Sequence, residues 1–195
     1  MGEETMALPL SEKMEHEQGD GGVSFGYKAL GANAVDERGN VDGSEYINVA
    51  QDDILAWPKV IHRTYPRTVN DRMENTLIPF VRKSKEINTV LLRVLEKKLG
   101  LPEGEFVKRH LEEETSGSET RCIKSAPVGP DGEGRFLAPH TDFGSVVSAV
   151  SLTLITDLMV PSHSFTIGLV VSRSCLLDRT HGNMSRYVAQ TGRVQ

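Results

Sequence analysis

The sequence changes from a helical to a strand-like pattern after Glu114, and this change constrains the fold more than any other feature. Before it, apolar residues between Ile87 and Leu99 recur three or four apart, as on one face of a helix. After it, Ser116-Gly117-Ser118 interrupts the pattern, and short strand-like runs follow, separated by turn formers. Helices followed by strands predict an α+β fold.

The main predicted helical region has defined limits. Thr68 can cap a helix beginning at Val69, and Pro79 should kink or restart it because proline lacks an amide proton. Gly100 supplies a left-handed C-cap, Pro102 prevents continuation, and a further short helix is expected over 103–111. The apolar stripe of the second run should pack against something large; it consists of Ile87, Leu91, Val94, Leu95 and Leu99.

Strands are expected on both sides of this region. Residues 45–49 alternate like a short edge strand, after a loop dense in turn formers. Residues 121–123 and 136–148 also have strand patterns, with a strong turn at 130–134 between them. Residues 1–23 combine acidic residues with Gly-Asp-Gly-Gly, which predicts a flexible leader before order begins near Phe25.

Composition restricts the classes of partner. The 195 residues, 38% apolar and 25% charged, form an ordinary mix for one globular domain, and the net charge of −5 gives no broad basic field. We therefore expect a small-molecule ligand, with no nucleic acid and no membrane as partner. Cys122 and Cys175 form no Cys-x-x-Cys pair, and the sequence has no secretory signal or membrane-spanning run, so a cytoplasmic protein is expected.

The segment Pro139-His140-Thr141-Asp142-Phe143-Gly144 carries the chemistry. Alternate side chains of a strand share a face, so His140 and Asp142 would point the same way. One imidazole and one carboxylate, completed by a second histidine, form a facial triad that leaves positions open on iron(II). A histidine beside a carboxylate can also be an ordinary hydrogen-bonded surface pair.

Three segments resemble the isopenicillin-N-synthase-like iron(II)/2-oxoglutarate-dependent dioxygenase family, in its fungal type. The string His140-Thr141-Asp142-Phe143-Gly144-Ser145 is similar to the family's iron-binding strand. Upstream, Ser116-Gly117-Ser118-Glu119-Thr120-Arg121 resembles its first barrel strand, and Lys98-Leu99-Gly100-Leu101-Pro102 the end of its long helix. The resemblance covers residues 25–148 in the right order.

The resemblance implies a helical N-terminal part packed on a distorted double-stranded β-helix, or jelly-roll. It also implies oxidation of a small organic molecule with Fe(2+), O2 and 2-oxoglutarate as cosubstrate, in secondary metabolism. His140 and Asp142 would be metal ligands, and Arg121 would point into the barrel and contact substrate, although an exposed strand arginine is the alternative. The chain would then divide into three parts: a flexible leader (1–23), the helical region and first barrel strands of a dioxygenase domain (24–148), and a divergent C-terminal segment (149–195).

The segment after Ser148 departs from the family pattern. The expected histidine followed by Arg-Val is missing, as is the Arg-x-Ser that would bind 2-oxoglutarate. His163 and His181 remain as candidates for the third ligand, and His181 is the one we retain. The barrel is therefore expected to be incomplete, with an open sheet edge.

Three functions stay open on the sequence alone: the oxygenase, a catalytically inactive remnant or partner-binding protein of the same family, and a cupin-like metal enzyme. The substrate and the oligomeric state do not follow from the sequence.

Overall fold

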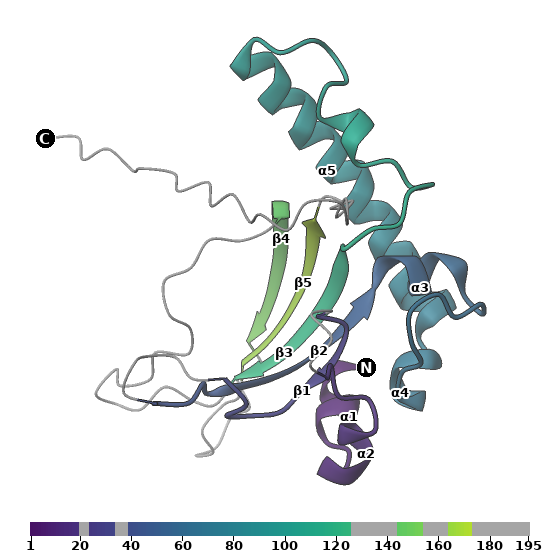
Figure 1. Cartoon of the computed structure of the whole chain (residues 1–195), viewed down its shortest axis with the longest axis vertical. Helices are drawn as coiled ribbons and strands as arrows, with labels where there is room; N and C mark the ends of the chain where they lie inside the picture. Colours follow the sequence, from purple (N-terminus) through teal and green to yellow (C-terminus); the bar gives the residue numbers. More distant parts are fainter. Residues whose placement is uncertain (20–23, 34–38, 126–143, 154–163, 173–195) are drawn as a thin grey trace, which may run out of the picture.

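The computed structural model describes residues 1–19, 24–33, 39–125, 144–153 and 164–172. Within them, five strands form one antiparallel sheet in the order β1-β2-β3-β5-β4. The helices gather along one side of this sheet, and the long helix α5 extends beyond its end (Figure 1). The predicted α+β class is confirmed. The strands are β1 (Gly26–Lys28), β2 (Ser44–Ala50), β3 (Glu119–Ser125), β4 (Gly144–Thr153) and β5 (Ser164–Ser172).

Two predicted signals in the centre of the chain are confirmed, but the predicted helix start is wrong, because α4 begins at Arg67 with Pro66 as its N-cap and Thr68 lies inside it. Pro79 lies in the first turn of α5, where its missing amide proton removes no helical hydrogen bond, so the predicted restart is confirmed. Gly100 ends α5 with φ 67°, the predicted left-handed cap. The helical elements are α1 (Gly2–Met6), α2 (Leu10–Met14), α3 (Gln51–Ala56), α4 (Arg67–Asn70), the π-helical turn η1 (Met73–Leu77), α5 (Ile78–Leu99) and the 3-10 turn η2 (Val107–Arg109). The helix predicted over 103–111 is thus reduced to η2.

The core lies between the sheet and the helices. Ile47 and Val49 of β2 point to the helical side, as does Cys122 of β3, since alternate residues of a strand share a face. They pack with buried side chains from the helical elements, namely Met6, Ile54, Val69, Met73, Leu77 and Val81. β2 is not the predicted edge strand, because β1 pairs with it on the side away from β3.

The N-terminal residues differ from the predicted flexible leader. Residues 2–14 form α1 and α2, and Thr5 and Met6 are buried. Lys13 Nζ lies 2.7 Å from Glu45 Oε2 of β2, and Tyr27 donates a hydrogen bond of 2.6 Å to the same oxygen. These contacts join residues far apart in sequence, so the local acidic and glycine-rich composition did not indicate them.

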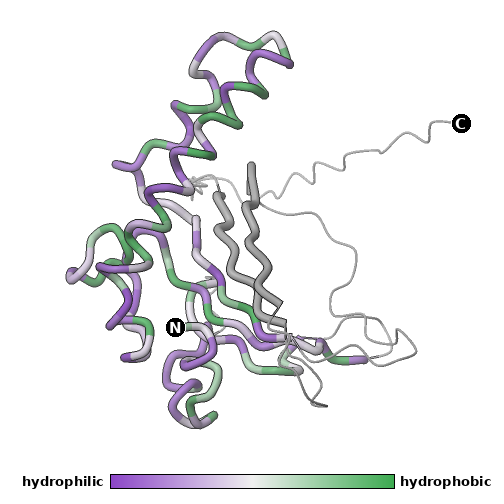
Figure 2. Tube along the Cα trace, turned by 180° about the vertical axis from the view of Figure 1, so that it is seen from behind, coloured by the Kyte–Doolittle hydropathy of each residue, from purple (hydrophilic) through white to green (hydrophobic). Residues whose placement is uncertain are grey.

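The apolar stripe of α5 also differs from its prediction. Figure 2 shows hydrophobic and hydrophilic residues alternating along α5 to its far end. The stripe residues are between 43% exposed (Leu91) and 64% exposed (Leu99), so no described residue covers this face. A neighbouring face of the helix is buried instead, through Val81, Ser84, Asn88, Leu92 and Glu96.

The sheet has open edges within the described residues. β4 pairs there only with β5, and β1 pairs with β2 and, at one isolated bridge, with Glu17. Across the same residues, no helix is both long enough and apolar enough to pass through a membrane.

Candidate functional site

The three predicted metal ligands, His140, Asp142 and His181, lie outside the described residues. Their ligand roles therefore stay predictions. Within the part of the chain that the structure describes, no group of three or more His, Cys, Asp and Glu side chains could hold a metal ion.

The predicted iron-binding segment comes just before β4 in the sequence. The start of β4 therefore marks the end of the sheet that is nearest to this segment along the chain. Gly144, two residues after Asp142, is the first residue of β4 and pairs with the last residue of β5. The same end of the sheet contains the first residue of β3, Glu119, and the last residue of β2, Ala50. Glu119 therefore lies at the end of the sheet where β4 begins.

Arg121 lies on that face of β3, because its neighbour Cys122 points into the core. Its Nε donates to Asn48 Oδ1 at 2.8 Å, and its Nη2 donates to Glu119 Oε1 at 2.5 Å. The guanidinium carbon lies 4.5 Å from the centroid of the Tyr46 ring, a cation–π distance. The side chain is 29% exposed. Its direction is thus fixed by three neighbours, and part of it remains accessible.

Arg121 is paired with different residue types on the two neighbouring strands. On one side Arg121 pairs with Asn48 of β2, and on the other with Gly168 of β5. On the β2 side, Asn48 contacts Arg121 directly.

Glu119 is the buried acidic partner of Arg121, with 3% of its surface exposed. Burial raises the pKa of its carboxyl, against the opposing effects of the Arg121 charge and a hydrogen bond from Ser24. The backbone carbonyl of Ser24 in turn accepts a 2.6 Å hydrogen bond from Asn48 Nδ2. Glu119, Asn48 and Ser24 therefore form one connected network that positions Arg121.

A second ion pair lies on the same face. Lys28 contacts Asp42, and both residues are 5% exposed. Lys28 Nζ also lies 5.4 Å from the centroid of the Tyr46 ring, which places this ring between two cations. Since each of the two cations has a carboxylate beside it, the described part of this face is polar and close to neutral.

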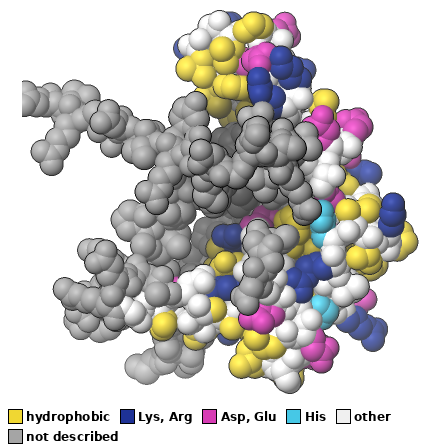
Figure 3. Space-filling view, viewed as in Figure 1, with side chains coloured by type: hydrophobic (Ala, Val, Ile, Leu, Met, Phe, Trp, Pro, Cys, Tyr) yellow, Lys and Arg dark blue, Asp and Glu magenta, His cyan; other side chains and the backbone are white. Residues whose placement is uncertain are grey.

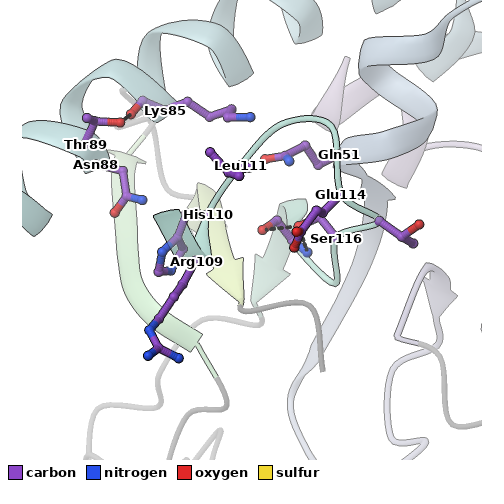
Figure 4. Close-up of a pocket in the computed structure, with 11 residues that line it drawn as sticks. Gln51, Lys85, Asn88, Thr89, Arg109, His110, Leu111, Glu114 and Ser116 are labelled. Atoms are coloured by element: carbon purple, nitrogen blue, oxygen red, sulfur yellow. Dashed lines mark hydrogen bonds between the residues drawn. The ribbon is translucent and has the colours of Figure 1, made fainter. Parts of the chain in front are cut away.

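A small polar pocket lies between α5, the start of α3 and the segment before β3 (Figure 4). Its volume is about 20 Å³, room for about one water molecule. Asn88, which lines it, is 3% exposed, and its Oδ1 has no hydrogen-bond partner among the described residues. The pocket fits a buried water better than a substrate.

Of the network around Arg121, sequence reasoning identified only the arginine itself. Glu119 could have been found, because it lies two residues earlier on the same predicted strand and therefore on the same face. Asn48 and Tyr46 could not, since their place beside Arg121 depends on how β2 pairs with β3.

The sequence matches no protein-family model, and no curated protein matches it. Two solved structures share its fold at low sequence identity. JOX2, in complex with 2OG, Fe and JA, is 18% identical, covers 89% of this chain and superposes with a TM-score of 0.54. A full-length Neurospora crassa protein in complex with alpha-KG is 13% identical, covers 89% of this chain and has a TM-score of 0.55. This chain spans 57% of the JOX2 chain and 64% of the Neurospora crassa chain.

Proposed function

We propose that this chain is an iron(II)- and 2-oxoglutarate-dependent oxygenase of the isopenicillin-N-synthase-like, fungal type that oxidises a small organic molecule. The observation that carries the proposal is a fold shared with JOX2 and the Neurospora crassa protein, whose structures contain 2OG and Fe or alpha-KG. The His140-Thr141-Asp142 sequence, which ends two residues before the first residue of β4, supports it.

The donor set fits the metal. His140 would supply a nitrogen and Asp142 an oxygen, a combination that suits iron(II), with His181 as the third ligand. When bound, the iron with 2-oxoglutarate and O2 supplies the oxidising power for the reaction. No Arg-x-Ser follows to hold the 2-oxoglutarate carboxylate, so the residues that bind this cosubstrate are not assigned.

Arg121 would bind and orient the substrate. Its Nε and Nη2 are engaged by Asn48 and Glu119, which leaves Nη1 to donate to an acceptor atom of the substrate. Tyr46 offers an aromatic surface beside the guanidinium. Glu119 and Asn48 act through Arg121 and are positioning residues.

The proposal is tested by succinate formation from 2-oxoglutarate. The purified chain should form succinate when iron(II) is added, and His140→Ala should lower the rate at least about 100-fold, because a metal ligand matters at least as much as a residue that supports one. His62→Ala is the matched control; His62 pairs with Asp52 on the surface and should tolerate the change. A folded protein that forms no succinate, or His140→Ala with unchanged activity, would contradict the proposal.

A cytoplasmic location and a role in secondary metabolism belong to the same proposal. The comparisons do not favour the inactive remnant or the cupin-like enzyme. Metal binding without any requirement for 2-oxoglutarate would revive the cupin-like alternative.

A further inference from the structure

We propose that the cavity beside Trp57 binds a small neutral aromatic molecule that carries one hydroxyl group. The cavity lies between the loop 57–64, which follows α3, and residues of α4 and η1. Figure 3 shows hydrophobic side chains at the surface among charged ones in the region of α3 and α4. The described residues that line the cavity include none of the network around Arg121, so this site goes beyond the oxygenase proposal.

The size of the cavity matches one aromatic ring. Its volume is about 150 Å³, the size at which an apolar cavity in another protein takes up benzene. Trp57, Pro58, Val60 and Met73 supply apolar surface, and the Trp57 indole is a partner for a second ring. The cavity therefore has room for a single ring with a small substituent.

The walls of the cavity are held in place by the protein itself. The carboxylate of Asp53, 2% exposed, accepts hydrogen bonds from the backbone N–H groups of Ile61 and His62 at 2.7 and 2.8 Å. It also accepts a hydrogen bond of 2.8 Å from the Tyr65 hydroxyl. These bonds fix the loop 57–64 against α3. A ligand that enters a cavity with fixed walls has less of the protein to order, which favours binding.

Two buried polar atoms at the cavity, Asn70 Oδ1 and Arg63 Nε, have no hydrogen-bond partner among the described residues. Asn70 Nδ2 donates a 2.8 Å bond to the carbonyl of Tyr65, so turning the amide round would set two oxygens against each other. The Nη1 and Nη2 of Arg63 donate to the carbonyls of Phe25 and Glu17. The cavity thus has one acceptor without a donor and one donor without an acceptor, and each is costly to leave unsatisfied.

A hydroxyl group is the smallest substituent that can satisfy both kinds of atom, because it donates one hydrogen bond and accepts others. The charges at the cavity favour a neutral ligand, since the Asp53 carboxylate opposes an anion and the Arg63 guanidinium opposes a cation. Phenol is the simplest molecule with these features. Water is the competing occupant, and it would leave the apolar surface of the cavity without a partner.

Fluorescence tests the proposal directly, because Trp57 is the only tryptophan of the chain. Phenol titrated into the full chain, with excitation where phenol does not absorb, should change this fluorescence to saturation with a Kd of about 1 mM. Benzene lacks the hydroxyl and should bind about fivefold more weakly, because it leaves Asn70 and Arg63 unsatisfied. Asn70→Leu should reduce this preference to about twofold or less. Asn75→Leu, at an exposed position of η1 outside the cavity lining, is the matched control and should keep it.

The absence of a saturable change with phenol would overturn the proposal, and it is the result expected of a cavity that holds only water. Equal binding of phenol and benzene to the unchanged protein would also overturn it, and this comparison needs no variant. So would an Asn70→Leu variant, folded by circular dichroism, that keeps the full preference. Because the titration needs neither iron nor turnover, its result is independent of the oxygenase proposal.

Discussion

Glu119 shows how one buried carboxyl makes stability depend on pH. Its raised pKa means that the folded protein keeps this proton at pH values where the unfolded chain has lost it. The protonated carboxyl therefore contributes stability below the ordinary pKa of 4.5, and this contribution is lost as the pH rises through the higher folded value.

Glu119→Gln should remove this dependence, because an amide does not titrate. As the pH rises above the ordinary pKa of 4.5 and through the higher folded value, the free energy of unfolding of the unchanged protein should fall relative to that of the variant. Urea denaturation at several pH values measures both. Asp71→Asn, at a position 61% exposed, is the control and should follow the unchanged protein. Parallel pH profiles for Glu119→Gln and the unchanged protein would show that this carboxyl has no raised pKa.

At the scale of the element, the end of α5 is fixed by a backbone conformation and by the hydrogen bonds of a side chain. Gly100 closes the helix in a left-handed conformation. The buried Glu96 carboxylate then accepts hydrogen bonds from the backbone N–H groups of Gly104, Phe106 and Val107. Burial raises the pKa of Glu96, but these three donors together outweigh it and leave the pKa below its usual range. The segment after α5 is thus held by the helix, which explains why residues 103–111 form only η2.

Gly100→Ala should destabilise the protein by about 1–2 kcal/mol, because an alanine Cβ is strained in the left-handed region. No atom lies within 4 Å of the position that this Cβ would occupy, so the cost comes from the backbone alone. Gly100→Asn should cost less, since asparagine tolerates this conformation better. Thermal and urea unfolding of both variants compare the two costs, and an equal loss in both would point to another cause.

At the scale of the whole molecule, Glu45 joins the N-terminal helices to the sheet. It accepts hydrogen bonds from Lys13 and Tyr27, and Lys124 lies 3.1 Å from its other oxygen. Burial raises the pKa of this carboxyl, but the hydrogen bonds outweigh that effect, so the pKa lies below its usual range. The resulting stability is present above the ordinary pKa and is lost as the pH falls through the lower folded value.

Glu45→Gln should therefore destabilise the protein by about 2–4 kcal/mol near pH 7, because Lys13 would be left buried without its charge partner. The difference from the unchanged protein should shrink in acid. Urea denaturation at pH 7 and pH 3 tests both statements, with the exposed Glu15→Gln as control. A loss below about 0.5 kcal/mol would mean that α1 and α2 contribute little to the fold.

Local signals in the sequence predicted several elements correctly. Pro79 and Gly100 bound α5 as expected, because each acts through its own backbone conformation. Alternation over 45–49 and the run 121–123 correctly predicted β2 and β3. The helices of residues 1–19 were missed, since their stability comes from Lys13 and Met6 meeting distant partners and not from local propensity.

In the centre of the chain, the sequence by itself predicted β2, β3 and the limits of α5, and its resemblance to a family singled out Arg121 and the His140-Thr141-Asp142 string. The predicted strands and helix limits rest on residues a few positions apart, because alternation, Pro79 and Gly100 act locally. Only the tertiary structure decided that Asn48, Glu119 and Tyr46 surround Arg121, and that the apolar stripe of α5 is exposed. The physical reason is that strand register and helix packing join residues far apart in sequence, such as Arg121 and Asn48, which are 73 positions apart, and a local pattern contains no information about such partners.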